Sequence, residues 1–171
     1  TPGQYSHQLG SISCIECNLG RFAPEPRSKR EQDCQYCEVG LFVDVRGSRL
    51  CKKCESGSYQ DEEGAASCKK CDAGTFEARS ASASCSQCPR GYYQEMIGQI
   101  SCSACPPGKD NRYLGGHRCN LCTMGTYESS TGSQECSKCP QGYYQQFETA
   151  AVSCKGCEAG LFQDQLESPG C

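Results

Sequence analysis

The sequence has no tryptophan, and Leu, Ile, Val and Phe together supply only 21 of its 171 residues. This share of about 12% lies below the roughly 20% with which chains usually build a conventional hydrophobic core. No apolar stretch approaches the roughly 18 residues of a membrane-spanning helix, and the first residues lack the pattern of a signal peptide. We therefore expect neither a single compact domain nor a membrane span, and we expect any export signal to lie outside this sequence.

The sequence also has no long segment in which charges of one sign are concentrated. Lys and Arg number 17 against 20 Asp and Glu, for a net charge of -3, and the two signs are interspersed along the chain. A nucleic-acid-binding protein would need a basic stripe or patch, so nucleic acid is not an expected partner. The basic pairs Lys52-Lys53 and Lys69-Lys70 are interpreted as solvated surface charge.

The patterns of an enzyme are missing as well. Only two histidines are present, His7 and His117, and no nucleophile and base recur at a shared spacing. There is no phosphate-binding Gly-Lys-Ser/Thr loop and no pair of carboxylates suited to acid–base catalysis. The acidic run 61–63 lacks the alternating ligand spacing of a calcium loop. We predict that the protein is not an enzyme and has no catalytic residue, cofactor or metal.

Cysteine is what the sequence has in abundance. Its 19 cysteines are typical of disulfide-linked secreted proteins, so the predicted location is extracellular or at the cell surface. Eighteen of them form nine Cys-x-x-Cys pairs, and a lone Cys171 follows. The pairs begin at Cys14, Cys34, Cys51, Cys68, Cys85, Cys102, Cys119, Cys136 and Cys154. Most intervals are 17 residues, which indicates tandem copies of one small unit.

The repeats share two further positions. A glycine is the third residue after the second cysteine of every pair, and an aromatic residue follows two residues later in all repeats but one, which has Asp110. The glycines are Gly20, Gly40, Gly57, Gly74, Gly91, Gly108, Gly125, Gly142 and Gly160, and Gly3 has the same phase ahead of the first pair. The aromatics are Tyr5, Phe22, Phe42, Tyr59, Phe76, Tyr93, Tyr127, Tyr144 and Phe162. A second glycine often lies seven residues after the first, as at Gly10 and Gly47.

This pattern predicts two short extended segments joined by a glycine turn, with the aromatic ring over a disulfide. The predicted fold is small and disulfide-rich, with tandem cystine-stapled β-hairpin or loop repeats of about 17 residues stacked into an elongated rod. Little regular secondary structure is expected, and the rod would be on the order of 90 Å long. The predicted units are a partial repeat 1–16, then repeats 17–36, 37–53, 54–70, 71–87, 88–104, 105–121, 122–138, 139–156 and 157–171.

The simplest disulfide pairing joins the second cysteine of each pair to the first cysteine of the next. These bonds are Cys17 to Cys34, Cys37 to Cys51, Cys54 to Cys68, Cys71 to Cys85, Cys88 to Cys102, Cys105 to Cys119, Cys122 to Cys136, Cys139 to Cys154 and Cys157 to Cys171. Cys14 is left unpaired, and its expected partner would stand before Thr1 in a longer protein. A rival scheme pairs first with first and second with second cysteines of neighbouring repeats, and the sequence alone leaves it open.

Cys-x-x-Cys is also a zinc motif and a redox motif. Zinc would use the pairs two at a time, whereas nine complete pairs leave one over and the intervals do not alternate in length. A thioredoxin-like active site would have one pair at a helix start, whereas here the pair recurs without a helical pattern. The prediction is therefore a disulfide scaffold.

Residues that break the repeat are the candidates for an interaction surface. Tyr92 and Tyr143 each precede the repeat aromatic and would point to the opposite face of an extended segment, with Met96, Ile97 and Phe147 as nearby apolar residues. Local packing over a neighbouring repeat is the alternative. The expected partners are proteins, either copies of itself or other surface proteins. The serine-rich runs 80–84 and 129–133 are candidate acceptors for O-linked glycans.

The pattern Cys-x-x-Cys-x-x-Gly-x-Tyr/Phe, as in residues 88–93 and 139–144, resembles the ephrin-receptor-like cysteine-rich repeat. It is also similar to the one-disulfide modules of the tumour necrosis factor receptors. The resemblance implies extracellular tandem repeats that serve as stalks, adhesive segments or ligand-binding ectodomains. Our first hypothesis is a structural rod within a larger secreted or cell-surface protein, such as a fibril or flagellar-hair component. The alternative is a ligand-binding ectodomain segment of a receptor or adhesion protein.

Overall fold

The computed structural model describes residues 2–6, 13–26, 28–147, 149–162 and 164–171. His7 and Gly10 lie outside these residues. The regular structure described consists of two-residue strands and one short 3-10 helix, η1 (Glu31–Asp33). The strands are β1 (Gln4–Tyr5), β2 (Ile15–Glu16), β3 (Arg21–Phe22), β4 (Gln35–Tyr36), β5 (Leu41–Phe42), β6 (Lys52–Lys53), β7 (Ser58–Tyr59), β8 (Lys69–Lys70), β9 (Thr75–Phe76), β10 (Ser86–Gln87), β11 (Tyr92–Tyr93), β12 (Ser103–Ala104), β13 (Lys109–Asp110), β14 (Asn120–Leu121), β15 (Thr126–Tyr127), β16 (Ser137–Lys138), β17 (Tyr143–Tyr144) and β18 (Lys155–Gly156).

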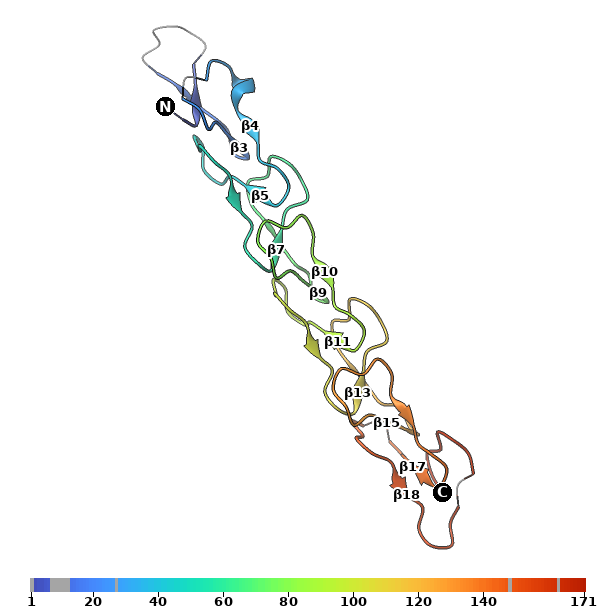
Figure 1. Cartoon of the computed structure of the whole chain (residues 1–171). Coiled ribbons are helices and arrows are strands. Elements are labelled where there is room, and N and C mark those ends of the chain that lie inside the picture. Colours follow the sequence, from blue (N-terminus) through green and yellow to red (C-terminus); the bar gives the residue numbers. More distant parts are fainter. Residues whose placement is uncertain (1, 7–12, 27, 148, 163) are drawn as a thin grey trace. The chain divides into compact units, whose positions relative to one another are not determined.

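The strands form antiparallel hairpins, which Figure 1 colours in chain order from blue to red. The pairs include β1 with β2, β3 with β4, β5 with β6, β7 with β8, β11 with β12, β13 with β14, β15 with β16 and β17 with β18. The first strand of a pair follows the repeat glycine, and the second consists of the two residues between the cysteines. In β7 and β8, for example, Ser58 lies opposite Lys70. The predicted fold of disulfide-rich hairpin repeats with little regular structure is confirmed.

The chain forms two compact units. The first consists of Thr1–Cys71, Glu77–Ser86 and Gly98–Ile100, and the second of Asp72–Phe76, Gln87–Ile97 and Ser101–Cys171. The predicted rod and its length concern the arrangement of the whole chain, and they stay a prediction.

Backbone hydrogen bonds join consecutive repeats within the first unit. Between repeats 54–70 and 71–87, the Gly57 N–H donates to the Glu77 carbonyl (2.7 Å) and the Gln60 N–H to the Ser82 carbonyl (3.0 Å). In the reverse direction, the Ala81 N–H donates to the Cys54 carbonyl (2.8 Å). These bonds satisfy backbone groups that a chain without long strands would otherwise leave unpaired.

The second unit repeats the same set of bonds. Between repeats 105–121 and 122–138, the Gly108 N–H donates to the Glu128 carbonyl (2.7 Å) and the Gly132 N–H to the Cys105 carbonyl (2.8 Å). Each of these repeats is therefore held to the next by backbone hydrogen bonds as well as by the covalent chain.

The repeat glycine is required by close contact with the backbone of the second repeat along the chain. Gly57 has a φ of 78°, and a Cβ on it would lie 2.2 Å from the carbonyl oxygen of Gly98. No side chain can fit at such a distance. The position of the second glycine also needs positive φ, because Ala81, which occupies it in repeat 71–87, has a φ of 59°.

The buried interior differs from the predicted layers of ring and cystine. The second cysteine of each pair from Cys17 to Cys139 is at most 1% exposed. Tyr5 is buried with the Cys17–Cys34 disulfide, as predicted, but most repeat aromatics are only half-buried and Phe162 is 80% exposed. The next residue along is buried instead, and in six consecutive repeats it is polar: Gln60, Glu77, Gln94, Asn111, Glu128 and Gln145.

These buried polar side chains hold the hairpin loops. The amide of Gln60 donates to the Ser67 carbonyl (2.7 Å), while its oxygen accepts the Glu62 N–H (3.0 Å). Gln94 makes the equivalent bonds to the Ser101 carbonyl (2.9 Å) and the Met96 N–H (3.1 Å). The small core is therefore made of cystine and hydrogen-bonded polar groups, in agreement with the shortage of aliphatic residues.

Candidate functional site

The disulfides form the chemical framework of the protein. The structure contains the bonds of the sequential scheme, with one closing each repeat: Cys17–Cys34, Cys37–Cys51, Cys54–Cys68, Cys71–Cys85, Cys88–Cys102, Cys105–Cys119, Cys122–Cys136, Cys139–Cys154 and Cys157–Cys171. Cys14 is free and exposed. Within the described residues, no group of three or more His, Cys, Asp and Glu side chains is placed to hold a metal ion. Nor does this part of the chain contain a helix long and apolar enough to cross a membrane.

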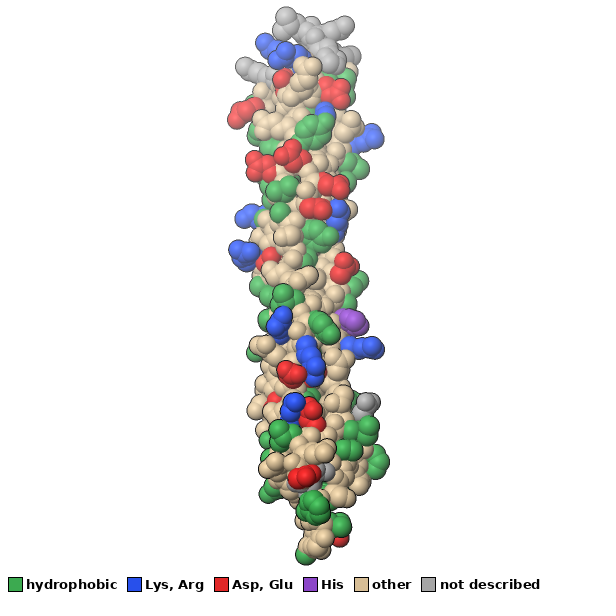
Figure 2. Space-filling view, turned by 90° about the vertical axis from the view of Figure 1, so that its right-hand side faces the viewer, with side chains coloured by type: hydrophobic (Ala, Val, Ile, Leu, Met, Phe, Trp, Pro, Cys, Tyr) green, Lys and Arg blue, Asp and Glu red, His purple; other side chains and the backbone are tan. Residues whose placement is uncertain are grey.

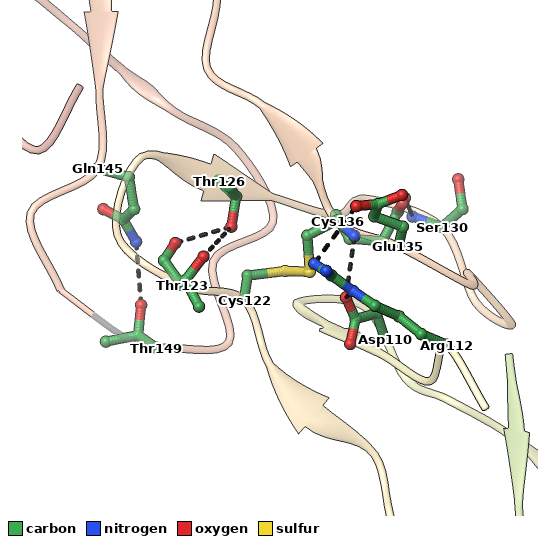
Figure 3. Close-up of a disulfide and its surroundings, with 11 residues drawn as sticks. Asp110, Arg112, Cys122, Thr123, Thr126, Ser130, Glu135, Cys136, Gln145 and Thr149 are labelled. Carbon is green, nitrogen blue, oxygen red and sulfur yellow. Dashed lines mark hydrogen bonds and ion pairs between the residues drawn. A yellow bond between two sulfur atoms is a disulfide. The ribbon is translucent and has the colours of Figure 1, made fainter. Parts of the chain in front are cut away.

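The repeat that lacks the aromatic contains the most unusual site. Asp110 ends β13 and is only 4% exposed, and its Oδ2 accepts the backbone N–H of Cys136 in the next repeat (3.1 Å). The Nε of Arg112 also approaches this oxygen (3.4 Å), and the Arg112 Nη2 lies 3.5 Å from the Glu135 Oε1. Figure 3 shows the Arg112 guanidinium between the two carboxylates, beside the Cys122–Cys136 disulfide. A buried carboxylate thus links two repeats where other repeats have a ring.

A pocket of about 240 Å³ opens at this site. Its lining includes Asp110 and Arg112 of one hairpin loop, Asn120 and Leu121 of β14, and Thr123. The sequence analysis recorded Asp110 as an exception to the repeat but did not identify it as part of a site. The available signal was the exception itself, because a short polar residue at the position where the other repeats have a ring leaves space that the ring would fill.

The comparison with protein families agrees with this architecture. The family model described as "Tyrosine-protein kinase ephrin type A/B receptor-like" matches residues 40–84, 74–116 and 111–151, which together cover more than half of the chain. The chain belongs to this family. A search among curated proteins found no match. The resemblance found in the spacing of cysteine, glycine and aromatic is therefore confirmed over the central ephrin-receptor-like repeats.

The predicted interface residues are exposed on these repeats. Met96, Ile97 and Phe147 are 62%, 59% and 64% exposed, and all three lie in hairpin loops. Tyr92 on β11 and Tyr143 on β17 are 39% and 46% exposed. The Tyr92 and Tyr143 rings also lie near glycines, each 3.7 Å from the point that a Cβ would take on Gly132 or Gly156, respectively.

Tyr92 therefore combines exposed area with packing over a later repeat, whereas Tyr143 combines exposed area with contact to Gly156, its partner across the strands of its own repeat. The structure does not bring the five residues together into one described contact. The interaction surface stays a prediction.

The charged surface of the repeats is mixed in sign. Lys52 on β6 pairs with Asp44 (2.7 Å), and Lys69 on β8 pairs with Asp61 (2.7 Å). Figure 2 shows basic and acidic side chains lying among one another on the face that it draws. The interpretation of the two lysine pairs as surface charge agrees with the exposure of both strands.

Two of the buried polar positions are carboxylates with a lowered pKa. The Ser130 backbone N–H donates to Glu128 Oε1 (2.7 Å), and this bond holds the pKa of Glu128 below its ordinary value, against the opposing effect of burial. The Arg79 backbone N–H lowers the pKa of Glu77 in the same way (2.9 Å). A hydrogen bond to the ionised form favours that form. Glu77 and Glu128 are therefore ionised while they hold their loops at neutral pH.

Proposed function

We propose that the chain is an extracellular structural segment of a larger secreted or cell-surface protein, in which disulfide-closed repeats keep a fixed spacing between the parts on either side. The observation that supports this most is the repetition of one set of backbone hydrogen bonds and one disulfide from repeat to repeat. Such a chain holds its shape through local contacts between neighbours and needs no large core. Each bond closing a loop of about 15 residues adds roughly 3 kcal/mol in the chain-entropy model.

The extracellular location rests on two supports. The 19 cysteines are typical of oxidising compartments, and the family is described by its likeness to ephrin receptors. The proposal includes no catalytic activity and no cofactor, because the positions that recur from repeat to repeat are used for turns, disulfides and loop contacts.

Solution scattering on the oxidised chain tests the structural role. A stack of repeats is expected to have a maximum dimension on the order of 90 Å. This is well beyond the maximum dimension of a globular chain of this length, whose radius of gyration is about 16 Å. Reduction should replace the rod by an unfolded chain, whose radius of gyration of about 44 Å exceeds that of the rod. A compact oxidised particle would contradict the proposal.

Lateral assembly into a fibril, including a flagellar hair, is the finer form of this proposal. It is supported by the exposed apolar side chains of Tyr92, Met96 and Tyr143. Electron microscopy and sedimentation of the native chain and of a Tyr92→Ser, Tyr143→Ser double variant would test it. Filaments that disappear in the double variant are expected, and monomers in both samples would contradict assembly through these residues.

A ligand-binding ectodomain segment is the second candidate function. It is favoured by the pocket beside Asp110, which departs from the repeat in a way that a purely structural segment does not need.

A further inference from the structure

We propose that the pocket beside Asp110 binds a cationic side chain, lysine or arginine, of a partner protein. This proposal goes beyond the structural role and gives a chemical identity to the ligand in the second candidate function. It rests on four observations, which concern the buried carboxylate, the size of the pocket, its charge and its place in the repeat.

The buried carboxylate is only partly satisfied. Both contacts of Asp110, from the Cys136 N–H and from the Arg112 Nε, are made to Oδ2. Its Oδ1 receives no hydrogen bond or ion pair from the described residues. Among the described residues no side-chain oxygen that is closed off from solvent lacks a hydrogen-bond partner, so Oδ1 is accessible to solvent, and hydrogen bonds to a charged group are the strong ones. Oδ1 is therefore an acceptor for a donor that enters the pocket.

The size and walls of the pocket fit a single long side chain. Its volume of about 240 Å³ is below the roughly 300–1,000 Å³ of sites for drug-sized ligands. Tyr113, which is 71% exposed, and Leu121, which is 46% exposed, supply apolar surface at its edge. Lysine and arginine pack their aliphatic stems along such surface while the charged head reaches a polar group.

The charge of the pocket selects a cation. Asp110 and Arg112 line the pocket and balance in charge, and Glu135, which contacts Arg112 from outside the lining, brings the sum of the three groups to one negative charge. The Arg112 side chain is 53% exposed and contacts the two carboxylates at 3.4 and 3.5 Å, outside the short range of charge-assisted hydrogen bonds. Arg112 acts as a loosely held internal guanidinium that an incoming cation can displace.

The place of the pocket in the repeat makes it specific. The neighbouring repeats have Tyr93 and Tyr127 at the position of Asp110. Exchange of a ring for a short acid creates space and charge at one repeat, while the backbone bonds on both sides are kept.

Titration of the isotope-labelled, oxidised full chain with Nα-acetyl-lysine methylamide tests the proposal by NMR. The Cys136 amide is the direct reporter, because it donates to Asp110. Nα-acetyl-norleucine methylamide is the matched uncharged probe, and Nα-acetyl-glutamate methylamide is the anionic one. The variants are Asp110→Asn, which keeps the shape and removes the charge, and Asp110→Tyr, which restores the ring of the repeat and fills the pocket. Asp61→Asn is the control, because Asp61 is a paired surface carboxylate outside the pocket.

The lysine probe is expected to shift the Cys136 amide in a saturable manner, and the norleucine and glutamate probes are not. Asp110→Asn should weaken lysine binding by about tenfold or more, and Asp61→Asn should leave it unchanged. Asp110→Tyr should abolish binding while the amides of the other repeats keep their native shifts. Arg112→Gln should tighten binding about threefold, because it removes the internal competitor.

Each of three outcomes would overturn the proposal: equal binding of the norleucine probe, weaker lysine binding in Arg112→Gln, or no saturable shift with the lysine probe. Preferred binding of the glutamate probe would instead identify an anion site built on Arg112 and would equally overturn it. None of these results affects the scattering test of the structural role.

Discussion

Repeats 88–104 and 105–121 follow one another in the chain, yet they differ at the position that the sequence pattern makes most conspicuous. The first has Tyr93 there and the second has Asp110, which is buried and bonded to the next repeat. Both keep the same backbone contacts, since Gly91 and Gly108 each donate to a carbonyl of the following repeat at 2.8 and 2.7 Å. Both also close a disulfide with a sequence separation of 14.

The difference teaches which parts of the repeat are indispensable. The ring can be exchanged for an acid while the glycine and the disulfide stay the same and a polar residue, Gln94 or Asn111, stays buried at the next position. The aromatic position therefore contributes packing, and the glycine and the disulfide determine the fold. The following predictions test this order, from the largest expected effect to the smallest.

Removal of one disulfide should cost the two repeats the same stability. Cys88→Ala with Cys102→Ala, and Cys105→Ala with Cys119→Ala, should each lower the local free energy of unfolding by about 3 kcal/mol, because the closed loops are equally long. Native-state hydrogen exchange over residues 88–121 measures both losses. A much larger loss in the repeat without the ring would mean that the aromatic residue normally contributes to the stability that we assign to the disulfide.

Replacement of the repeat glycine separates steric contact from backbone strain. In Gly91→Ala and Gly108→Ala, the new Cβ would lie 2.0 and 2.2 Å from the backbone of a later repeat, whereas at Gly142 no described atom lies within 4 Å. All three glycines have positive φ, so Gly142→Ala shows the cost of φ alone, about 1 kcal/mol. The other two should lose about 2 kcal/mol more, measured by denaturant unfolding. Equal losses at all three sites would contradict the close backbone contact.

Truncation of the buried polar residue should loosen the hairpin loop in both repeats, and in Asn111→Ala it also removes the bond from the Asn111 amide to the Tyr92 carbonyl of the preceding repeat (2.7 Å). Gln94→Ala and Asn111→Ala each remove the acceptor of a loop N–H, that of Met96 (3.1 Å) or Tyr113 (3.2 Å). Each should cost about 1–2 kcal/mol, since groups of the hairpin loop lose their partner. Faster hydrogen exchange of the Met96 and Tyr113 amides is the expected readout. Unchanged exchange would show that these side chains only fill space.

The acid response extends the comparison to repeat 122–138, where Glu128 takes the position of Asn111. Its folded-state pKa lies below the ordinary value of 4.5, so its contribution to stability is full above that value and is lost as the pH falls through the folded pKa. Glu128→Gln should behave like the native chain at pH 7 and lose less thermal stability between pH 5 and 3. Asn111→Asp, in a repeat with a neutral residue, is the converse variant and should add acid sensitivity. Identical pH profiles for native and Glu128→Gln chains would contradict the role of the Ser130 contact.

The sequence predicted the parts of the fold that repeat in residue type. Cysteine, glycine and aromatic share one phase, so hairpin repeats and their family could be inferred without the structure. The buried Gln60, Glu77 and Gln94 were missed, because polar residues in a chain with little core suggest solvent exposure. Their recurrence at one phase of the repeat was the signal that could have located them.

The Asp110 site was beyond sequence reasoning for a different reason. Its contact with the Cys136 N–H spans 26 residues and depends on how two hairpins pack. The sequence indicated only that a ring was absent. The place of the pocket, and the second carboxylate Glu135 near Arg112, required coordinates.

Disulfide mapping tests the central claim most directly, namely that every repeat is closed by its own bond. Trypsin cleaves in the lysine pairs that separate the cysteines at residues 51–54 and 68–71, and it releases peptide 54–69 with Cys54 and Cys68 and no internal basic residue. After thiol blocking and unfolding without reductant, this peptide should appear as a single species that lacks two thiol hydrogens, with Cys54 bonded to Cys68. Recovery of Cys54 or Cys68 only in cross-links to neighbouring peptides, such as Cys51 with Cys68, would contradict the account.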